Sequence, residues 1–491
     1  MSGILGSETE FGIAVKGEAR ADAVSSSVFL VNSYPYLVSS STLWDYENEN
    51  PLLDARGFEA DGERERPGSD YNKILNKLLA NGGRFYVDGA HPEYSTPECS
   101  NAKELVLYEK AGERILELAV EFANRRKEGS RFSIYKNNTD HKGNSYGYHE
   151  NYLVDRAVPF DKLTEQLIPF FVTRPIFAGS GKVGSDTKAD TVPYQISQRA
   201  DFFEVLVDLN TMVKRPLMNT RDEPHADPSR YRRLHVIVGD ANMSEVTTYL
   251  KVGTLMLVLT MIENGRYVDG VALDNPVRSM KDISRDLTLK ETHRMQKGGQ
   301  WTAIEIQRRY LEAAESHLAQ NTDPITRDIL TRWRTVLDQL AEEPRQLARE
   351  IDWIIKRDLM ESYMERKGCS WRDPRVFMMD LQYHDVVRQN GLYYTLERAN
   401  RVERLVLPEE VELAQVTPPE GTRAYFRGNC LKKFQKDVYA ASWSTMLFHT
   451  SNGVIKKVPL MDPFKGNKER VGSLLDKAHT VDELLVLLAK G

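Results

Sequence analysis

The chain has 491 residues, which allows about three domains, or one large domain with a smaller appendage. Apolar residues make up 41% and charged residues 28%, so disorder, a collagen-like repeat and a coiled coil are excluded as descriptions of the whole chain. The net charge is −5, whereas a nucleic-acid binder would carry an excess of Lys and Arg. This composition favours a cytoplasmic enzyme.

Neither a membrane span nor a secretion signal is expected. The longest apolar run, residues 252–262, is far shorter than the ~20 residues that a membrane-spanning helix needs. The N-terminus lacks the basic region that opens a signal peptide. The three cysteines, Cys99, Cys369 and Cys430, have no metal-like spacing, which fits a reducing compartment.

The first third of the chain predicts two strands, a loop and a helix. Residues 3–15 alternate like a strand, with Glu8 and Glu10 on one face. The polar stretch 39–70 is rich in Gly and Pro and predicts a long, mobile loop. Residues 83–89 alternate again. A helix of about 25 residues should then begin after the cap residue Asn101 and close near Arg126.

The middle of the chain predicts further strands and long helices. Five short β-branched or aromatic segments are interpreted as strands of one antiparallel or mixed sheet: 131–136, 147–154, 168–178, 201–209 and 232–238. Residues 244–265 predict an apolar helix, and 299–366 a helical hairpin broken near Pro324. The segment 407–420 is interpreted as a linker, and 421–491 as a small C-terminal domain that ends in an amphipathic helix.

Polar side chains occupy strand faces that would otherwise be apolar. Glu8 and Glu10 lie two residues apart, so both carboxylates are within reach of a hard cation, although such a pair alone is more often a solvated face. In the second strand Arg84, Tyr86 and Asp88 share one face, and Phe85 and Val87 take the other. Glu93 and Glu98 follow in HPEYSTPEC. Together these residues predict a concave surface that binds Mg²⁺.

Two histidines complete this pattern. His149 and Asn151 share a face in SYGYHENY, and His235 lies in RRLHVIVGDAN. Taken singly, each histidine is more typical of a hydrogen-bonded core residue. Taken together, they would complete a metal site already supplied with acids.

Two arginines are candidates for binding phosphate oxygens. Arg199 and Arg221 lie in short polar turns, and the alternative for each is a surface salt bridge with Asp201 or Asp222. The glycines of 179–184 match GxGxxG, but no helix is expected after them, so we interpret 178–192 as a flexible loop. The residues thus indicate a metal- and nucleotide-dependent enzyme acting at a carboxyl or carboxamide carbon, with Asp88 as base or nucleophile.

Five motifs carry a family resemblance over nearly the whole chain: GSETEFG, GGRFYVDGAHPEYSTPEC, YKNNTDHKGNSYGYHENY, NTRDEPHAD and YRRLHVIVGDAN. They resemble the family of the ligase and the deamidase/depupylase of the prokaryotic ubiquitin-like protein Pup, relatives of glutamine synthetase and glutamate–cysteine ligase. Residues 44–70, beginning WDYENENPLLDARGF, resemble the loop of the depupylase branch, which the ligase lacks.

The resemblance implies an α+β fold: a glutamine synthetase-like domain over 1–410, with a curved antiparallel sheet flanked by helices, and a small domain over 421–491. It implies an ATP- and Mg²⁺-dependent hydrolase that deamidates the C-terminal Gln of Pup and cleaves the Pup–Lys isopeptide bond. The alternative within the family is the ligase, which forms that bond through an acyl phosphate. A small-molecule carboxylate–amine ligase and a non-catalytic Pup-binding adaptor are further alternatives.

The resemblance also assigns roles to residues. Those implied to surround Mg²⁺ are Glu8, Glu10, Tyr86, Glu93, His149 and His235. Arg84, Thr96 and Trp443 would contact ATP. Arg199 and Arg221 would hold the terminal phosphate or the developing oxyanion. Asp88 matches the catalytic aspartate, as nucleophile or as general base.

The implied partners are Pup and pupylated proteins, without nucleic acid or membrane, and contact with a proteasomal ATPase is left open. Disordered Pup should fold on binding into a groove. One candidate for that groove is the basic stretch Arg423, Arg427, Lys432, Lys433 and Lys436. The alternative for this stretch is a solvated face or part of the nucleotide pocket.

Overall fold

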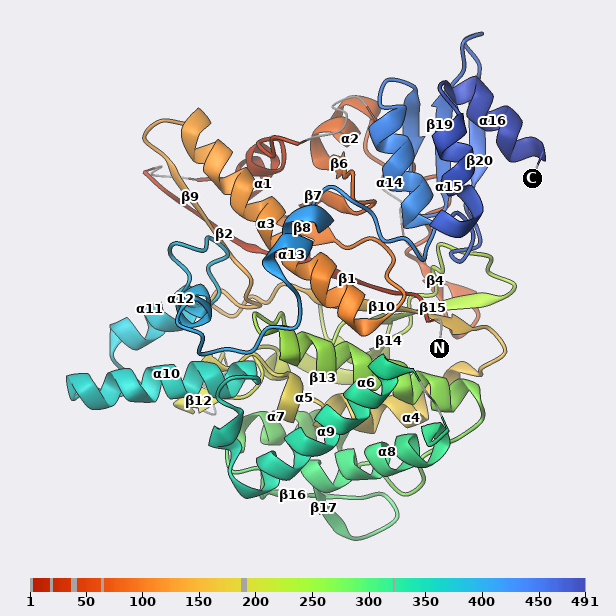
Figure 1. The fold of residues 1–491 in the computed structure, drawn as a ribbon. Helices are drawn as coiled ribbons and strands as arrows, with labels where there is room; N and C mark the ends of the chain where they lie inside the picture. The colour runs from red at the N-terminus through yellow and green to blue at the C-terminus, as the bar shows by residue number, and fades with distance from the viewer. Residues whose placement is uncertain are drawn as a thin grey trace.

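The computed structural model describes residues 3–17, 21–36, 42–62, 66–186, 192–320 and 323–490. Its largest sheet has six antiparallel strands in the order β15-β10-β1-β8-β7-β6 (Figure 1). The strands are β1 (Leu5–Glu10), β6 (Asn76–Leu78), β7 (Arg84–Asp88), β8 (His91–Ser95), β10 (Tyr148–Asp155) and β15 (Tyr231–Val236). The predicted α+β class with a large antiparallel sheet is confirmed.

The strand register gathers polar side chains on one face of this sheet. Glu8 lies opposite His149 in β10 and Ser95 in β8. Glu93 lies opposite both Glu10 and Tyr86. On the other face the sheet buries apolar and aromatic side chains, among them Phe85, Tyr94, Tyr152 and Leu234. Because successive side chains of a strand alternate between faces, one face becomes core and the other stays available for chemistry.

Two long helices, α3 (Ala102–Arg126) and α6 (Glu245–Glu263), lie on the core side of the main sheet (Figure 1). The side chain of Asn101 caps α3 by accepting a hydrogen bond from the backbone of Glu104 at 2.9 Å, which confirms the predicted start. By length and composition α6 could cross a membrane, but 89% of its apolar window is buried inside the protein. This helix therefore has the surroundings of a core helix.

The remaining helices are α1 (Ala23–Val31), α2 (Ser69–Leu75), α4 (Phe160–Thr173), α5 (Pro175–Ala178), α7 (Pro276–Arg285), α8 (Ala303–Leu318), α9 (Pro324–Glu342), α10 (Asp352–Lys367), α11 (Pro374–Tyr383), α12 (Leu392–Arg398), α13 (Pro408–Ala414), α14 (Ala424–Lys433), α15 (Lys468–Lys477) and α16 (Val481–Lys490). Short 3₁₀ helices cover Ala200–Phe202 and Pro344–Leu347. The predicted hairpin over 299–366 is thus α8 and α9, broken where expected, followed by a separate α10.

Five small sheets are formed by strand pairs. These are β2 (Gly12–Lys16) with β9 (Arg131–Tyr135), β4 (Leu53–Asp54) with β5 (Phe58–Glu59), β11 (Lys182–Val183) with β12 (Tyr194–Gln195), β13 (Phe203–Asp208) with β14 (Arg215–Asn219), and β16 (Thr292–Arg294) with β17 (Gln300–Thr302). The β13–β14 pair is parallel.

The C-terminal part has its own core. A four-stranded sheet joins β20 (Ile455–Pro459), β19 (Thr445–His449), β18 (Val438–Ala441) and β3 (Leu43–Trp44). Helices α14, α15 and α16 pack beside this sheet (Figure 1). Trp44 from the N-terminal part is buried in this core with Phe426 and Phe448. The two parts are therefore interlocked, and the predicted domain limits 1–410 and 421–491 stay predictions.

Several expectations for single elements were wrong. Residues 3–15 form two strands, because the chain changes partner after Glu10: β1 pairs with β8 and β10, and β2 with β9. Residues 168–178 are not a strand but belong to α4 and α5, whose apolar side chains are buried on all sides. The strands β9 and β13 exist but lie outside the main sheet. The expected linker 407–420 contains α13, which packs against α3.

The two predicted loops are only partly described. In the stretch 39–70, residues 39–41 and 63–65 lie outside the described residues. The rest contains β3, β4 and β5, so the expectation of a segment without regular structure was wrong there, and mobility stays a prediction. In 178–192, residues 187–191 lie outside the described residues, and β11 precedes them.

Candidate active site

The polar face of the main sheet is the floor of a large cavity that is open to solvent. Every predicted site residue except Thr96 lines this cavity: Glu8, Glu10, Arg84, Tyr86, Asp88, Glu93, His149, Arg199, Arg221, His235 and Trp443. Thr96 lines an adjoining cavity. The structure therefore brings the predicted residues together, although their roles stay predictions.

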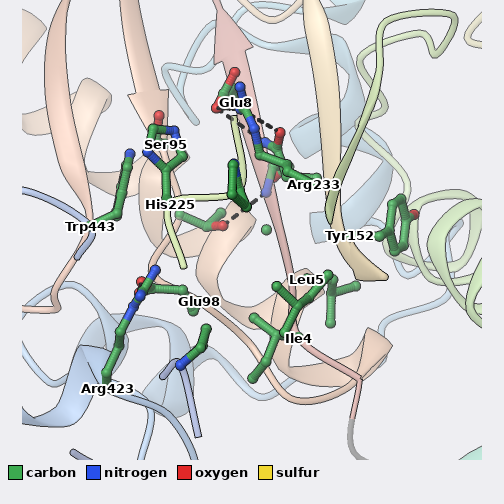
Figure 2. Close-up of a pocket in the computed structure, with 17 residues that line it drawn as sticks. Ile4, Leu5, Glu8, Ser95, Glu98, Tyr152, His225, Arg233, Arg423 and Trp443 are labelled. Atoms are coloured by element: carbon green, nitrogen blue, oxygen red, sulfur yellow. Dashed lines mark hydrogen bonds and ion pairs between the residues drawn. The ribbon is translucent and has the colours of Figure 1, made fainter. Parts of the chain in front are cut away.

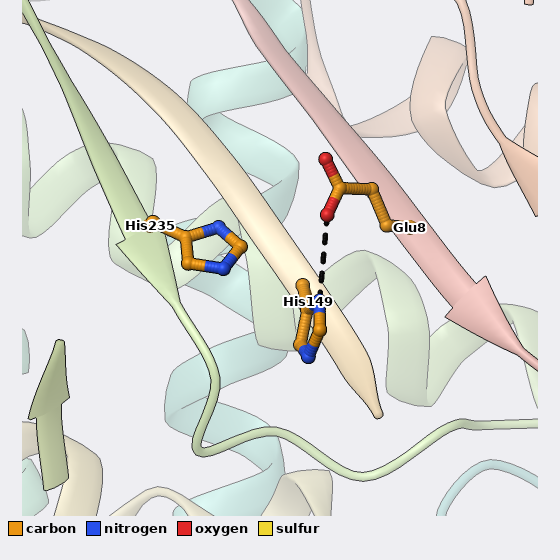
Figure 3. A group of neighbouring side chains, drawn as sticks. All are labelled: Glu8, His149 and His235. Atoms are coloured by element: carbon orange, nitrogen blue, oxygen red, sulfur yellow. Dashed lines mark hydrogen bonds and ion pairs between the residues drawn. The ribbon is translucent and has the colours of Figure 1, made fainter. Parts of the chain in front are cut away.

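The first cluster of metal-ligand side chains consists of Glu8, His149 and His235 (Figure 3). One ligand atom from each lies within 4.8 Å of the others. Nδ1 of His149 lies 3.4 Å from a carboxylate oxygen of Glu8. Burial raises the pKa of Glu8, but the hydrogen bond with His149 and the positive charge of its neighbours outweigh burial and hold the pKa well below its ordinary value. Glu8 is therefore an ionised ligand candidate.

The second cluster consists of Glu10, Asp88 and Glu93, again with ligand atoms within 4.8 Å of one another. The backbone N–H of Gly147 donates a hydrogen bond to Glu10 at 2.7 Å. A Cβ atom at Gly147 would lie 2.4 Å from Nε2 of His149, so only glycine lets the chain pass here. Three carboxylates this close repel one another, which a shared cation would relieve.

Two buried atoms are available to a cation. Oε2 of Glu93 and Nε2 of His235 are buried and have no hydrogen-bond partner among the residues that the structure describes. Nδ1 of His235 lies 3.0 Å from Oδ1 of Asn151, which orients the ring and leaves Nε2 facing the first cluster. Burial, followed by the positive charge of Arg233, lowers the pKa of His235 well below its ordinary value, so the imidazole is neutral and can ligate. Oxygen and imidazole donors of this kind suit a divalent metal.

Asp88 ends β7 at the rim of the cavity. The residue as a whole is exposed, but its carboxyl group lies within 4.8 Å of those of Glu10 and Glu93. Surrounding protein atoms, followed by the negative charge of Glu10, raise the pKa of this carboxyl group. A carboxylate that is both accessible and more basic than usual suits attack on a carbonyl or proton abstraction from water.

Arg84 and Tyr86 are neighbouring side chains on the polar face of β7. The Arg84 guanidinium lies 3.9 Å from the ring centroids of both Trp44 and Tyr86, and its Nε donates to Asn76 at 3.0 Å. The Ser95 hydroxyl donates to the Tyr86 oxygen at 3.2 Å. Burial, followed by the negative charge of Glu93, raises the pKa of Tyr86 well above its ordinary value. The phenol is thus neutral in this structure.

Arg199 is buried, and no carboxylate of the described residues pairs with it. Its guanidinium donates to carbonyl oxygens of Gly239 and Ile237 and to the Ser145 hydroxyl at 3.3 Å. Asp201, which the sequence suggested as its salt-bridge partner, pairs with Arg285 instead. Burial and then the charge of Arg215 lower the pKa of Arg199 to about 10. A buried cation bonded only to neutral groups is suited to binding an anion.

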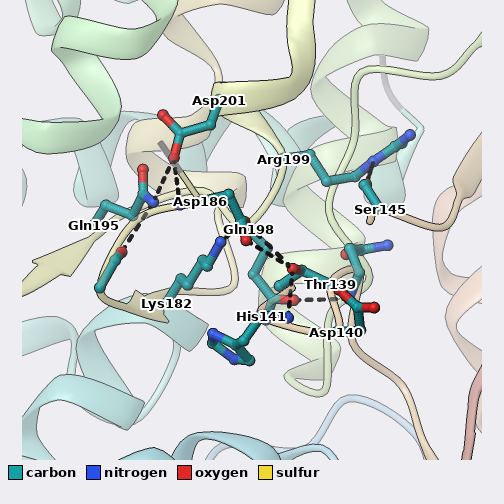
Figure 4. Close-up of polar contacts among 12 residues, drawn as sticks. Thr139, Asp140, His141, Ser145, Lys182, Asp186, Gln195, Gln198, Arg199 and Asp201 are labelled. Carbon is teal, nitrogen blue, oxygen red and sulfur yellow. Dashed lines mark hydrogen bonds and ion pairs between the residues drawn. The ribbon is translucent and has the colours of Figure 1, made fainter. Parts of the chain in front are cut away.

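Figure 4 shows polar contacts around Arg199, which include those of Asp201 with Gln195 and Asp186. The Ser197 hydroxyl accepts from the backbone of Arg199 at 3.1 Å and donates to Asp240 at 2.9 Å. Next to it, Lys182 pairs with Asp186, and Asp201 accepts from Gln195 at 3.1 Å. The turn that carries Arg199 is therefore tied to the core by charged groups.

Arg221 also lacks its suggested partner. Asp222 pairs with Arg156, and Nε of Arg221 is buried without a hydrogen-bond partner. Burial, followed by the charge of Arg233, lowers the pKa of Arg221. Both predicted arginines thus direct positive charge into the cavity, as an anion site requires.

The adjoining cavity lies between β1, β8 and the C-terminal part (Figure 2). Thr96 accepts a hydrogen bond from the backbone of Ser7 at 3.0 Å, and Trp443 packs edge-on against Trp44. Glu98 contributes to neither carboxylate cluster, since it pairs with Arg423 and Arg427. The predicted basic groove is therefore wrong for these two arginines, which are buried and paired.

Several groups that line the main cavity were not predicted from the sequence, among them Tyr46, Glu49 and Arg215. Tyr46 and Glu49 come from the predicted loop, and Arg215 begins β14. Trp44 donates a hydrogen bond to Glu49 at 2.6 Å, and the backbone of Asn50 donates to Glu223. A lone Arg in a turn carries no signal in one sequence. The WDYENEN motif belongs to the predicted loop, but its local sequence does not indicate that Trp44 and Tyr46 pack against Arg84.

The antiparallel sheet, its two ligand clusters and the two arginines that line the cavity fit an α+β enzyme that acts at a carboxyl or amide carbon. The chain belongs to the Pup-ligase protein family, whose model matches residues 3–447.

Relatives from both branches of the family are similar to the chain. The depupylase of Acidothermus cellulolyticus is 46% identical, over 100% of both chains. The Pup deamidase/depupylase of Mycolicibacterium smegmatis is 42% identical, over 99% of both chains. The Pup–protein ligase of Actinosynnema mirum is 44% identical, but over 82% of this chain and 91% of its own. The depupylases thus match a larger share of the chain than the ligase does.

Two solved structures share the fold. The Pup ligase PafA in complex with Pup has a TM-score of 0.81 at 30% identity, covering 100% of this chain and 94% of its own. PafA in complex with ADP has a TM-score of 0.74 at 33% identity, covering 85% and 96%.

Proposed function

We propose that the chain is an ATP- and Mg²⁺-dependent hydrolase that deamidates the C-terminal Gln of Pup and cleaves the isopeptide bond between Pup and a target lysine. The observation that carries this proposal is the similarity to depupylases, at 42–46% identity over 99–100% of the chain. The accessible carboxylate of Asp88, which belongs to the second ligand cluster, supports it.

Two adjoining cavities support binding of a nucleotide and a metal. A nucleotide would lie in the cavity lined by Thr96 and Trp443, as the ADP-bound ligase suggests for this family. The two ligand clusters would hold Mg²⁺, with Tyr86 beside them and Arg84 toward the nucleotide. When bound, Mg²⁺ would neutralise phosphate oxygens and polarise oxygen ligands. Nucleotide is required to order the site rather than as an energy source, because hydrolysis of an amide is downhill.

Both reactions are attack on the same side-chain carbonyl carbon. Asp88 either attacks that carbon itself, forming an anhydride that water then opens, or removes a proton from the attacking water. In both routes the C–N bond breaks, the nitrogen leaves as ammonia or as the lysine amine after gaining a proton, and the product is a carboxylate. Arg199 and Arg221 would stabilise the oxyanion that develops on the carbonyl oxygen.

The ligase is the second candidate, because ligase relatives reach 44% identity. Incubation with Gln-terminated Pup, ATP and Mg²⁺ separates the two functions. The proposal predicts release of ammonia and conversion of Gln to Glu. No ammonia, together with conjugation of Glu-terminated Pup to lysine, would overturn it in favour of the ligase. Turnover of ATP with glutamate and a small amine in the absence of Pup would indicate a small-molecule ligase.

A cytoplasmic location and contact with a proteasomal ATPase remain predictions from the sequence. Co-purification with proteasomal ATPase from cell extract would test the contact.

A further inference from the structure

Arg215 is a cation in the main cavity for which the proposed reaction has no role so far. It begins β14 and lines the cavity together with Ser145 and Arg199. Its Nε donates to the Thr211 carbonyl at 3.0 Å, and its Nη2 donates to the Ser145 carbonyl at 2.8 Å. Among the described residues, no carboxylate lies within 4.0 Å of its guanidinium, and Nη1 has no hydrogen-bond partner.

The position of Arg215 separates it from the nucleotide end of the site. Arg215, Arg199 and Ser145 line the main cavity but not the adjoining cavity that contains Thr96. Ser145 connects the two arginines, because its hydroxyl accepts from Arg199 and its carbonyl accepts from Arg215. Arg215 therefore lies at the acyl end of the site, on the side of Glu10 and Asp88.

The loop before Arg215 exposes apolar surface at the cavity mouth. Met212 is 75% exposed and Val213 64% exposed, although Met212 lines the cavity. Met212 is therefore placed where an incoming chain could contact it.

From this geometry we infer that Arg215 recognises the free α-carboxylate of the substrate's C-terminal residue. This inference rests on the proposed function. When a side-chain amide of a C-terminal Gln is attacked, the α-carboxylate lies a few bonds away and must be accommodated in the same cavity. In an isopeptide-linked terminal residue that carboxylate is equally free. Arg215 with an open Nη1 supplies the charge-assisted hydrogen bond, and Met212 would contact the preceding backbone.

The inference explains selection of a chain end. An internal Gln has a peptide bond in place of the α-carboxylate and would leave the half-buried Arg215 against an uncharged group. A site built to bind a charge disfavours a substrate that lacks it, because the half-buried arginine loses its charge-assisted hydrogen bond.

The test combines a change in the protein with a change in the substrate. Hydrolysis is measured with semisynthetic Gln-terminated Pup that carries either a free α-carboxylate or an α-carboxamide. Wild-type protein is expected to lose about 10- to 100-fold in kcat/KM on the carboxamide. R215M is expected to lose a similar factor on the carboxylate and to show no further loss on the carboxamide. R215K should retain part of the preference, and R266M, which removes an exposed arginine outside the cavity, should behave as wild type.

Three outcomes would overturn the inference. Equal kcat/KM for both substrates with wild-type protein would exclude carboxylate recognition, and that arm needs no variant to fold. If R215M and the carboxamide substrate each lower kcat/KM and their combination lowers it by the product of the two factors, Arg215 acts on another anion, such as a phosphate. No hydrolysis of the unmodified substrate would overturn the proposed function and this inference together, and so is distinguishable from the other two results.

Discussion

The buried ion pairs of Glu98 connect the main sheet to the C-terminal part, and Glu98→Gln should weaken the fold measurably. Glu98 accepts hydrogen bonds from Nε of Arg423 at 2.7 Å and from Nη1 of Arg427 at 3.2 Å. Its side chain is 12% exposed, and those of Arg423 and Arg427 are 3% and 0% exposed. Removing the carboxylate charge would leave two buried arginines without compensation.

The pKa of Glu98 gives the size of the effect. Burial raises this pKa, but the charges of Arg427 and Arg423 outweigh burial and lower it from 4.5 to about 2. At about 1.4 kcal/mol for each pH unit, the difference corresponds to about 3 kcal/mol of stability. Because the pKa in the folded state is the lower one, this stability is present in full above pH 4.5 and is lost as the pH falls toward 2.

Urea unfolding at pH 7 and at pH 4 measures this prediction. Glu98→Gln should lower the free energy of unfolding by about 3 kcal/mol at pH 7, and by about 1 kcal/mol less at pH 4. Glu420→Gln, which breaks an exposed pair with Lys468, is the control and should cost under about 1 kcal/mol. A Glu98→Gln protein as stable as wild type at both pH values would refute the reasoning.

Three further predictions concern other parts of the molecule. Burial raises the pKa of Asp385 to about 6. Asp385→Asn should therefore stabilise the protein by up to about 3 kcal/mol at pH 7 and by almost nothing at pH 4. Unfolding midpoints that shift equally at both pH values would contradict this. His235→Asn should weaken Mg²⁺ binding about 10-fold or more, as measured by calorimetry, because it removes the unpartnered Nε2, and an unchanged affinity would exclude His235 as a ligand. Trp443→Ala should weaken nucleotide binding several-fold in a fluorescence titration, whereas Trp443→Phe should preserve most of it; equal losses would argue against a stacking role.

The strand face on which each candidate residue lies was more predictable than the order of the strands, because strand alternation is a local property. The spacing of Glu8 and Glu10, of Tyr86 and Asp88, and of His149 and Asn151 placed each pair on one strand face. The sequence did not reveal that Glu10 and Tyr86 both lie opposite Glu93, because strand order depends on long-range pairing. The family resemblance placed Glu10, Tyr86 and Glu93 around one metal site without a prediction of the strand order.

The wrong predictions have physical causes. The segment 168–178 is apolar and aromatic because it is a buried helical segment, and periodicity cannot separate such a helix from a buried strand. Pro408 and the acidic residues after it suggested a linker, but proline at the first position of a helix and acids in its first turn equally favour α13. Arg215 was missed because its proposed role depends on the tertiary fold, which places Ser145 and Arg199 next to it.

The most direct test of the central claim is mass spectrometry of Gln-terminated Pup after incubation with ATP, Mg²⁺ and either wild-type protein or Asp88→Asn. Wild type should convert the terminal Gln to Glu with release of ammonia, and Asp88→Asn should lose this conversion while still binding nucleotide and Pup. Conversion at the wild-type rate by Asp88→Asn, or unchanged Gln with wild-type protein, would contradict the account.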